Sequence, residues 1–131
     1  MSMRILLVDD DDQLRDVLGR LLERRGYAVH TASGADSAYA LLSEQAVDAV
    51  VIDLNMPDIP GHALYFALVA RWPYLRGRIA IMSGNLADID PTLSSEILAC
   101  PRLAKPFDFD ALEQAIATLT APDELRRRNG G

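Results

Sequence analysis

The chain has 131 residues, of which 50% are apolar, and this is enough to build one sizeable core without disulfides or structural metals. Lysine and arginine number 13 against 19 acidic residues, and the net charge of -6 argues against nucleic-acid binding. A single cysteine, Cys100, excludes an internal disulfide, and no leader-like or membrane-length apolar run is present. We therefore expect one cytoplasmic globular domain that contacts neither nucleic acid nor membrane.

The first elements in chain order are a strand and a helix. Residues 4–8 form a nearly continuous apolar run, which is typical of a strand covered on both faces. After four acidic residues, leucine and valine recur at helical spacing from Leu14 to Leu22, and Gly26 ends the pattern. Asp11 and Asp12 are expected to be solvated or to cap this amphipathic helix.

The same alternation continues along the rest of the chain. Asp108 or Asp110 is expected to cap the last helix, which buries its apolar face up to Leu119. Parallel strands need crossover connections, so five strand-helix pairs with short links predict an α/β fold of three layers. We expect the domain to span residues 1–121 and residues 122–131 to form a short, charged, solvated tail. The later strands are expected at 27–31, 49–52, 79–82 and 102–104, and the later helices at 35–42, from Gly61 to about 72, and between 91 and 98.

Polar residues follow the apolar runs at the points where four strands end. Asp9 and Asp10 follow the first strand, Asp53 the third, Ser83 the fourth and Lys105 the fifth. Each of these residues alone is typical of a helix cap, a turn or the surface. In an open α/β sheet, however, ligands bind at the carboxyl ends of the strands, so we expect these side chains to converge on one rim.

The residues of this rim indicate phosphoryl chemistry. Clustered carboxylates repel one another unless a cation neutralises them, and a site rich in oxygen and without imidazole suits Mg2+. Beside Mg2+, the carboxylate of Asp53 can attack a phosphoryl group. Lys105 can pair with a phosphoryl oxygen, and Ser83 can donate a hydrogen bond to another. His30 and His62 are expected to lie away from the cluster and to have no catalytic role.

Four motifs resemble those of bacterial response-regulator receiver domains, including single-domain regulators of the chemotaxis type. They are LVDD at 7–10, DLNMP at 53–57 followed by Gly61, MSG at 82–84 and KPF at 105–107. The resemblance spans residues 5 to about 119. It implies a flavodoxin-like three-layer sandwich with five helices and a five-stranded parallel sheet in the order 2-1-3-4-5.

The resemblance also implies a role for each site residue. Asp53 would be the phosphorylated residue, and Ser83 and Lys105 would sense the phosphoryl group. Asp9 and Asp10 would form the acid pocket, with Asp10 the more direct Mg2+ ligand. The backbone carbonyl of Asn55 would be a further Mg2+ ligand, and the peptide bond before Pro106 would be cis.

The implied function is that of a stand-alone receiver in a two-component system or phosphorelay. The donor would be a phosphohistidine on a histidine kinase or on a phosphotransfer protein. The phosphorylated chain would signal through contacts with a downstream protein and slowly lose its phosphoryl group. It would catalyse its own phosphorylation and dephosphorylation without being a turnover enzyme.

Two features depart from the commonest family pattern. The position three residues before the lysine is usually aromatic, and here it is Arg102. The segment from 84 to 102 contains Pro91 and Pro101 and lacks the usual alanine-glycine run, so the fourth helix is expected to be short or displaced.

Two alternatives belong to other functional classes. A receiver-like adaptor would bind partners without phosphorylation, and the intact acid pocket, Ser83 and Lys105 argue against it. An Mg2+-dependent phosphohydrolase of the haloacid dehalogenase type would use Asp53 as nucleophile and a second aspartate two residues later as general acid. That position is Asn55 in this chain, which argues against the phosphohydrolase.

Overall fold

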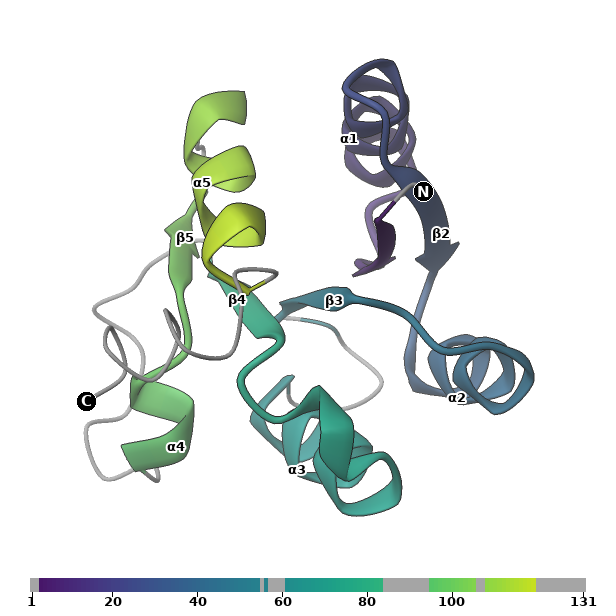
Figure 1. The fold of residues 1–131 in the computed structure, drawn as a ribbon, viewed down its shortest axis with the longest axis vertical. Helices are drawn as coiled ribbons and strands as arrows, with labels where there is room; N and C mark the ends of the chain where they lie inside the picture. The colour runs from purple at the N-terminus through teal and green to yellow at the C-terminus, as the bar shows by residue number, and fades with distance from the viewer. Residues whose placement is uncertain (1–2, 55, 57–60, 84–94, 106–107, 120–131) are drawn as a thin grey trace.

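The fold is a five-stranded parallel sheet with helices on both faces (Figure 1). The computed structural model describes residues 3–54, 56, 61–83, 95–105 and 108–119. The sheet has the order β2-β1-β3-β4-β5, and every neighbouring pair is parallel, as predicted. The strands are β1 (Arg4–Val8), β2 (Ala28–Ala32), β3 (Ala49–Asp53), β4 (Ile79–Ser83) and β5 (Arg102–Ala104). The helices are α1 (Asp12–Arg24), α2 (Ala35–Glu44), α3 (Gly61–Arg71), α4 (Ser95–Leu98) and α5 (Phe109–Leu119), with one 3-10 turn, η1 (Pro73–Leu75).

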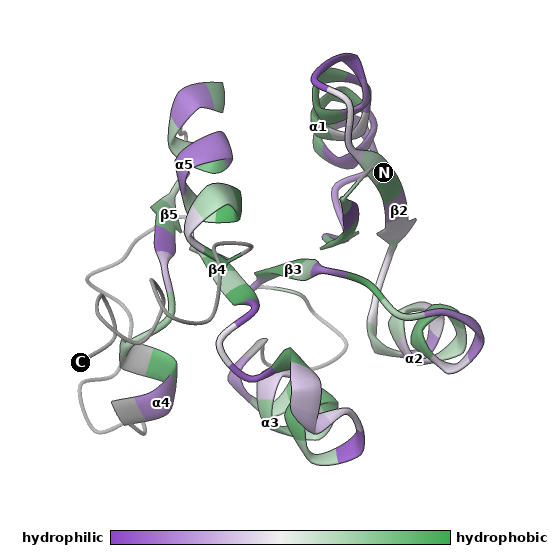
Figure 2. Ribbon diagram, viewed as in Figure 1, coloured by the Kyte–Doolittle hydropathy of each residue, from purple (hydrophilic) through white to green (hydrophobic). Residues whose placement is uncertain are grey.

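The sheet separates two hydrophobic cores. Figure 1 shows α1 and α5 on one side of the sheet and α2, α3 and α4 on the other. Side chains alternate between the two faces of a strand, so Ile5 and Leu7 pack with α1 and α5 while Leu6 and Val8 pack with α2 and α3. In Figure 2 hydrophilic and hydrophobic residues are mixed on α1 and α5, as expected of helices with one face on a core. Both faces of the sheet are therefore covered, which explains why the three inner strands, β1, β3 and β4, are apolar except for one residue at an end of each.

The predicted helix ends are largely confirmed. The side chain of Asp11 accepts a hydrogen bond from Leu14 N at 3.0 Å and caps α1. Gly26 follows this helix with a φ of 94°, a conformation that favours glycine. Of the two candidate caps of α5, Asp108 makes the bond, at 2.8 Å to Ala111 N.

Strand β2 begins one residue later than expected. The amide of Tyr27 bonds to Leu22 O at 3.2 Å and so belongs to the turn after α1, whereas Ala32 pairs with Val8 in the sheet.

Among the described residues, no helix is long and apolar enough to cross a membrane.

The described part of the fourth helix is α4, and residues 84–94, which make up most of the segment where a short or displaced helix was expected, lie outside the described residues. Glu96 of α4 accepts hydrogen bonds from the Tyr65 hydroxyl at 2.9 Å and from Arg76 Nε at 2.5 Å. The bond from Arg76, more than that from Tyr65, lowers the pKa of Glu96, whose burial acts in the opposite direction. Cys100 is a free, partly buried thiol, and burial raises its pKa to about 11. Side chains distant in sequence thus anchor α4 to the fold.

Candidate functional site

The carboxyl ends of β1, β3, β4 and β5 bring the predicted site residues together at one rim. Asp9, Asp53 and Ser83 are 1%, 3% and 3% exposed. Backbone bonds of the sheet hold their positions, since Leu54 N bonds to Met82 O at 2.9 Å and Lys105 N to Ser83 O at 2.7 Å. The convergence expected from the strand ends is therefore present in the fold.

The ammonium group of Lys105 bridges two buried carboxylates. Its Nζ lies 3.0 Å from Oδ2 of Asp9 and 3.1 Å from Oδ2 of Asp53. Burial acts to lower the pKa of Lys105, but the hydrogen bonds to Asp9 and Asp53 outweigh it, so the pKa is raised. Burial raises the pKa of Asp9, and the bonds from Asp11 N and Lys105 only partly oppose this effect. Asp9 and Asp53 thus lie in a poorly solvated setting beside the ammonium group of Lys105.

The rim also offers a set of metal ligands. Asp9, Asp10 and Asp53 each present a carboxylate oxygen, and these three atoms lie within 4.8 Å of one another. The three carboxylates outnumber the one ammonium group that bridges two of them, so a divalent cation would offset the excess of negative charge. An all-oxygen set of this kind fits Mg2+. The predicted further ligand, the carbonyl of Asn55, and the peptide bond before Pro106 lie outside the described residues.

Other predicted residues lie where the sequence indicated. Arg102 is exposed at the start of β5, the edge strand. His30 is in the middle of β2, and its Nδ1 lies 3.4 Å from Nε2 of Gln45. His62 is exposed near the start of α3, and no described contact links it to the acidic cluster.

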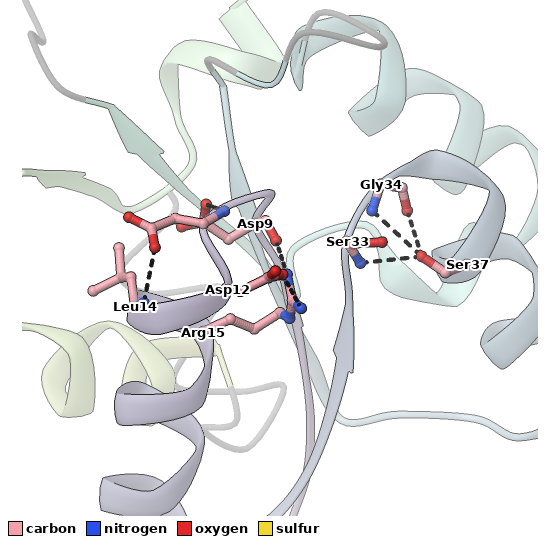
Figure 3. Close-up of polar contacts among 8 residues, drawn as sticks. Asp9, Asp12, Leu14, Arg15, Ser33, Gly34 and Ser37 are labelled. Carbon is pink, nitrogen blue, oxygen red and sulfur yellow. Dashed lines mark hydrogen bonds and ion pairs between the residues drawn. The ribbon is translucent and has the colours of Figure 1, made fainter.

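One residue near the site was missed by sequence reasoning. The guanidinium of Arg15 donates from Nη1 to the backbone oxygen of Asp9 at 2.6 Å and pairs through Nη2 with Asp12 (Figure 3). A basic residue three positions after an acidic one at the start of a helix was the available signal. On its own, that spacing indicates only a surface ion pair.

The receiver-domain model of response regulators matches residues 5–117. Two similar curated proteins are from Pseudomonas aeruginosa. The response regulator protein FleR is 31% identical over 117 residues, which are 89% of this chain and 24% of FleR. The transcriptional regulatory protein GltR is 32% identical over an alignment of 133 positions that covers 97% of this chain and 52% of GltR. The chain thus spans about half the length, or less, of these relatives.

Solved structures show the same fold. A response regulator receiver domain protein from Clostridium thermocellum superposes with a TM-score of 0.81 at 25% identity, covering 95% of this chain and 98% of that one. The response regulator TrrA from Thermotoga maritima, in complex with Mg2+-BeF, has a TM-score of 0.77 at 25% identity, with coverages of 89% and 98%. A response regulator from Burkholderia pseudomallei with a phosphorylated aspartic acid has a TM-score of 0.75 at 25% identity, with coverages of 98% and 73%. The chain therefore belongs to the family of response regulator receiver domains.

Proposed function

We propose that this chain is an Mg2+-dependent phosphoryl acceptor that carries its signal on Asp53. The observation that supports this most directly is the ammonium group of Lys105, which bridges the buried carboxylates of Asp53 and Asp9 beside the exposed carboxylate of Asp10. The proposed donor is a phosphohistidine on a histidine kinase or a phosphotransfer protein. The solved structures from T. maritima and B. pseudomallei, with Mg2+-BeF and a phosphorylated aspartic acid, support the proposal by analogy.

The proposed step is an in-line displacement at phosphorus. A carboxylate oxygen of Asp53 forms a bond to phosphorus while the bond between phosphorus and the donor nitrogen breaks, and the leaving imidazole takes up a proton from water. Lys105 can shift one of its hydrogen bonds to a phosphoryl oxygen, and Ser83 can donate to another. Asp9, Asp10, Asp53 and the carbonyl of Asn55 would hold Mg2+. The metal ion would offset the negative charge on the transferring oxygens.

The alternatives lack supporting groups. A phosphohydrolase of the haloacid dehalogenase type needs an acid two residues after the nucleophile, and Asn55 cannot donate a proton in that role. An adaptor that works without phosphorylation has no need for two buried carboxylates bridged by a partly buried lysine, because burying these charges is costly. We propose that the domain spans residues 1–121 and that residues 122–131 form a tail. We also propose that the chain acts as a stand-alone receiver, which signals by binding a downstream protein.

Acetyl phosphate tests the proposed function without the natural donor. In the presence of Mg2+, intact-mass analysis is expected to show one added phosphoryl group per chain. Addition of EDTA is expected to prevent the addition, because the uncompensated carboxylates then repel the anionic donor. Failure to label the chain at any Mg2+ concentration would favour the adaptor, and equal labelling in EDTA would contradict the requirement for Mg2+.

Asp10 is expected to matter more for Mg2+ binding than Asp11 or Asp12. Asp10→Ala should weaken Mg2+ binding about tenfold or more, because it removes a ligand from the set of three. Asp11→Ala should leave the Mg2+ affinity nearly unchanged. The Asp11 side chain caps α1, and the hydrogen bond from the backbone N–H of residue 11 to Asp9 is retained in the variant. Isothermal titration calorimetry with Mg2+ measures both. Equal losses in the two variants would mean that a diffuse acidic loop holds the metal.

A further inference from the structure

The four consecutive acids after β1 have four different surroundings. Asp9 is buried, and its carboxylate accepts bonds from Lys105 and from Asp11 N, the latter at 2.9 Å. The Asp11 carboxylate caps α1, and the Asp12 carboxylate pairs with Arg15. Asp10 is exposed, and in the part of the chain that the structure describes its side chain makes no hydrogen bond or ion pair. One acid of the four is therefore left available to a ligand at the rim.

Arg15 holds the loop on both sides of Asp10. Its Nη1 donates to the carbonyl oxygen of Asp9 at 2.6 Å, and its Nη2 lies 2.5 Å from Oδ1 of Asp12 (Figure 3). The Arg15 side chain is only 18% exposed, whereas the Asp12 side chain is 83% exposed. The guanidinium is a planar, rigid fork, so two such bonds define the distance between the Asp9 carbonyl and the Asp12 carboxylate.

We propose that Arg15 is a positioning residue of the Mg2+ site. By bonding to the Asp9 carbonyl, it sets the backbone from which Asp10 extends toward Asp9 and Asp53. By pairing with Asp12, it keeps a competing carboxylate away from the rim and relieves the repulsion among consecutive acids. This inference rests on the proposed Mg2+-dependent function, and it assigns a role to a residue that does not itself contact the metal.

Charge and positioning make opposite predictions for the loss of Arg15. As a nearby cation, Arg15 repels Mg2+, so on Coulombic grounds alone its removal would strengthen Mg2+ binding. If Arg15 instead orders the acids, its removal weakens Mg2+ binding, as is typical when groups that orient metal ligands are lost. The sign of the change in affinity therefore separates the two effects.

The variants Arg15→Met and Arg20→Met form a matched pair. Arg20 is on the same helix and pairs with Asp16 at 3.2 Å. Both side chains are largely exposed, at 75% and 61%, and this ion pair does not involve residues 9–12. Each variant removes one positive charge. We expect Arg15→Met to bind Mg2+ about tenfold more weakly than the parent in calorimetric titrations. Arg20→Met should bind Mg2+ as tightly as the parent or slightly more tightly.

A conservative variant and a second readout complete the test. Arg15→Lys keeps the positive charge but lacks the forked guanidinium, so its Mg2+ affinity should fall between those of the parent and Arg15→Met. If Arg15→Met does not fold, the comparison of Arg15→Lys with the parent is the test. Without metal, the amide of Asp11, which bonds to Asp9 Oδ1, should exchange its hydrogen faster in either variant.

Two results would overturn the inference. One is a parent-like or tighter Mg2+ affinity in Arg15→Met, and the other is full parental behaviour of Arg15→Lys in both affinity and exchange. The proposed function fails separately, because its failure would appear as a parent chain that does not bind Mg2+ or is not phosphorylated.

Discussion

Asp53→Asn is expected to take up no phosphoryl group from acetyl phosphate and Mg2+ under conditions that label the parent. The asparagine amide has nearly the shape of the carboxylate but is not a nucleophile, so the loss of labelling should be complete. Intact-mass analysis of both proteins after the same incubation gives the result.

Asp48→Asn is the control for the loss of one carboxylate. Asp48 precedes β3, at the opposite end of that strand, and its Oδ2 accepts a hydrogen bond from Arg4 N at 2.8 Å. This variant should be labelled as fully as the parent. Labelling of Asp53→Asn to the parental level would place the acceptor elsewhere and refute the proposed role of Asp53.

Lys105→Met is expected to lower stability in a way that Mg2+ reverses. The variant leaves Asp9 and Asp53, whose side chains are 2% and 5% exposed, without the cation that bridges them. Removing one partner of a buried ion pair costs about 3 to 5 kcal/mol, and we expect about 2 kcal/mol here because the lysine side chain is 23% exposed. Mg2+ should bind more tightly without the competing ammonium group and therefore stabilise the variant more than it stabilises the parent.

Urea unfolding with and without Mg2+ measures this effect. Arg76→Met is a suitable control, because it breaks an ion pair with Glu96 that is largely open to solvent. The Arg76 side chain is 59% exposed and the Glu96 side chain 30%. That variant should lose little stability, because solvent screens an exposed ion pair, and the loss should be the same with and without Mg2+. A loss in Lys105→Met that Mg2+ does not reduce would show that the lysine acts only through packing and not as the counter-charge of the site.

The sequence by itself determined the order of the elements and the residues at the rim. Runs such as 49–52 and 79–82 are local signals of buried strands, and the polar residue after each run marks the carboxyl end of a strand. Parallel strands place these ends at one edge, so Asp9, Asp53, Ser83 and Lys105 could be grouped before the fold was known. The strand order came from the family resemblance and was confirmed.

Only the tertiary structure decided which groups contact each other at that edge. The bonds from Lys105 to Asp9 and Asp53 span 96 and 52 positions of the sequence, and no local periodicity encodes them. The sequence likewise assigned no partner to Glu96 of α4, which the fold places against Tyr65 and Arg76.

The acids from Asp9 to Asp12 show the same limit at close range. They are identical residues in an unbroken run, and their sequence separation from the strand explains only why the first is buried. The others differ in their partners, because the Asp11 side chain caps α1 and the Asp12 side chain pairs with Arg15, whose guanidinium also bonds to the Asp9 carbonyl on the other side of Asp10. Which acid meets which partner depends on the path of the loop between β1 and α1. The packing of the helix on the sheet determines this path, and four chemically identical side chains cannot encode it.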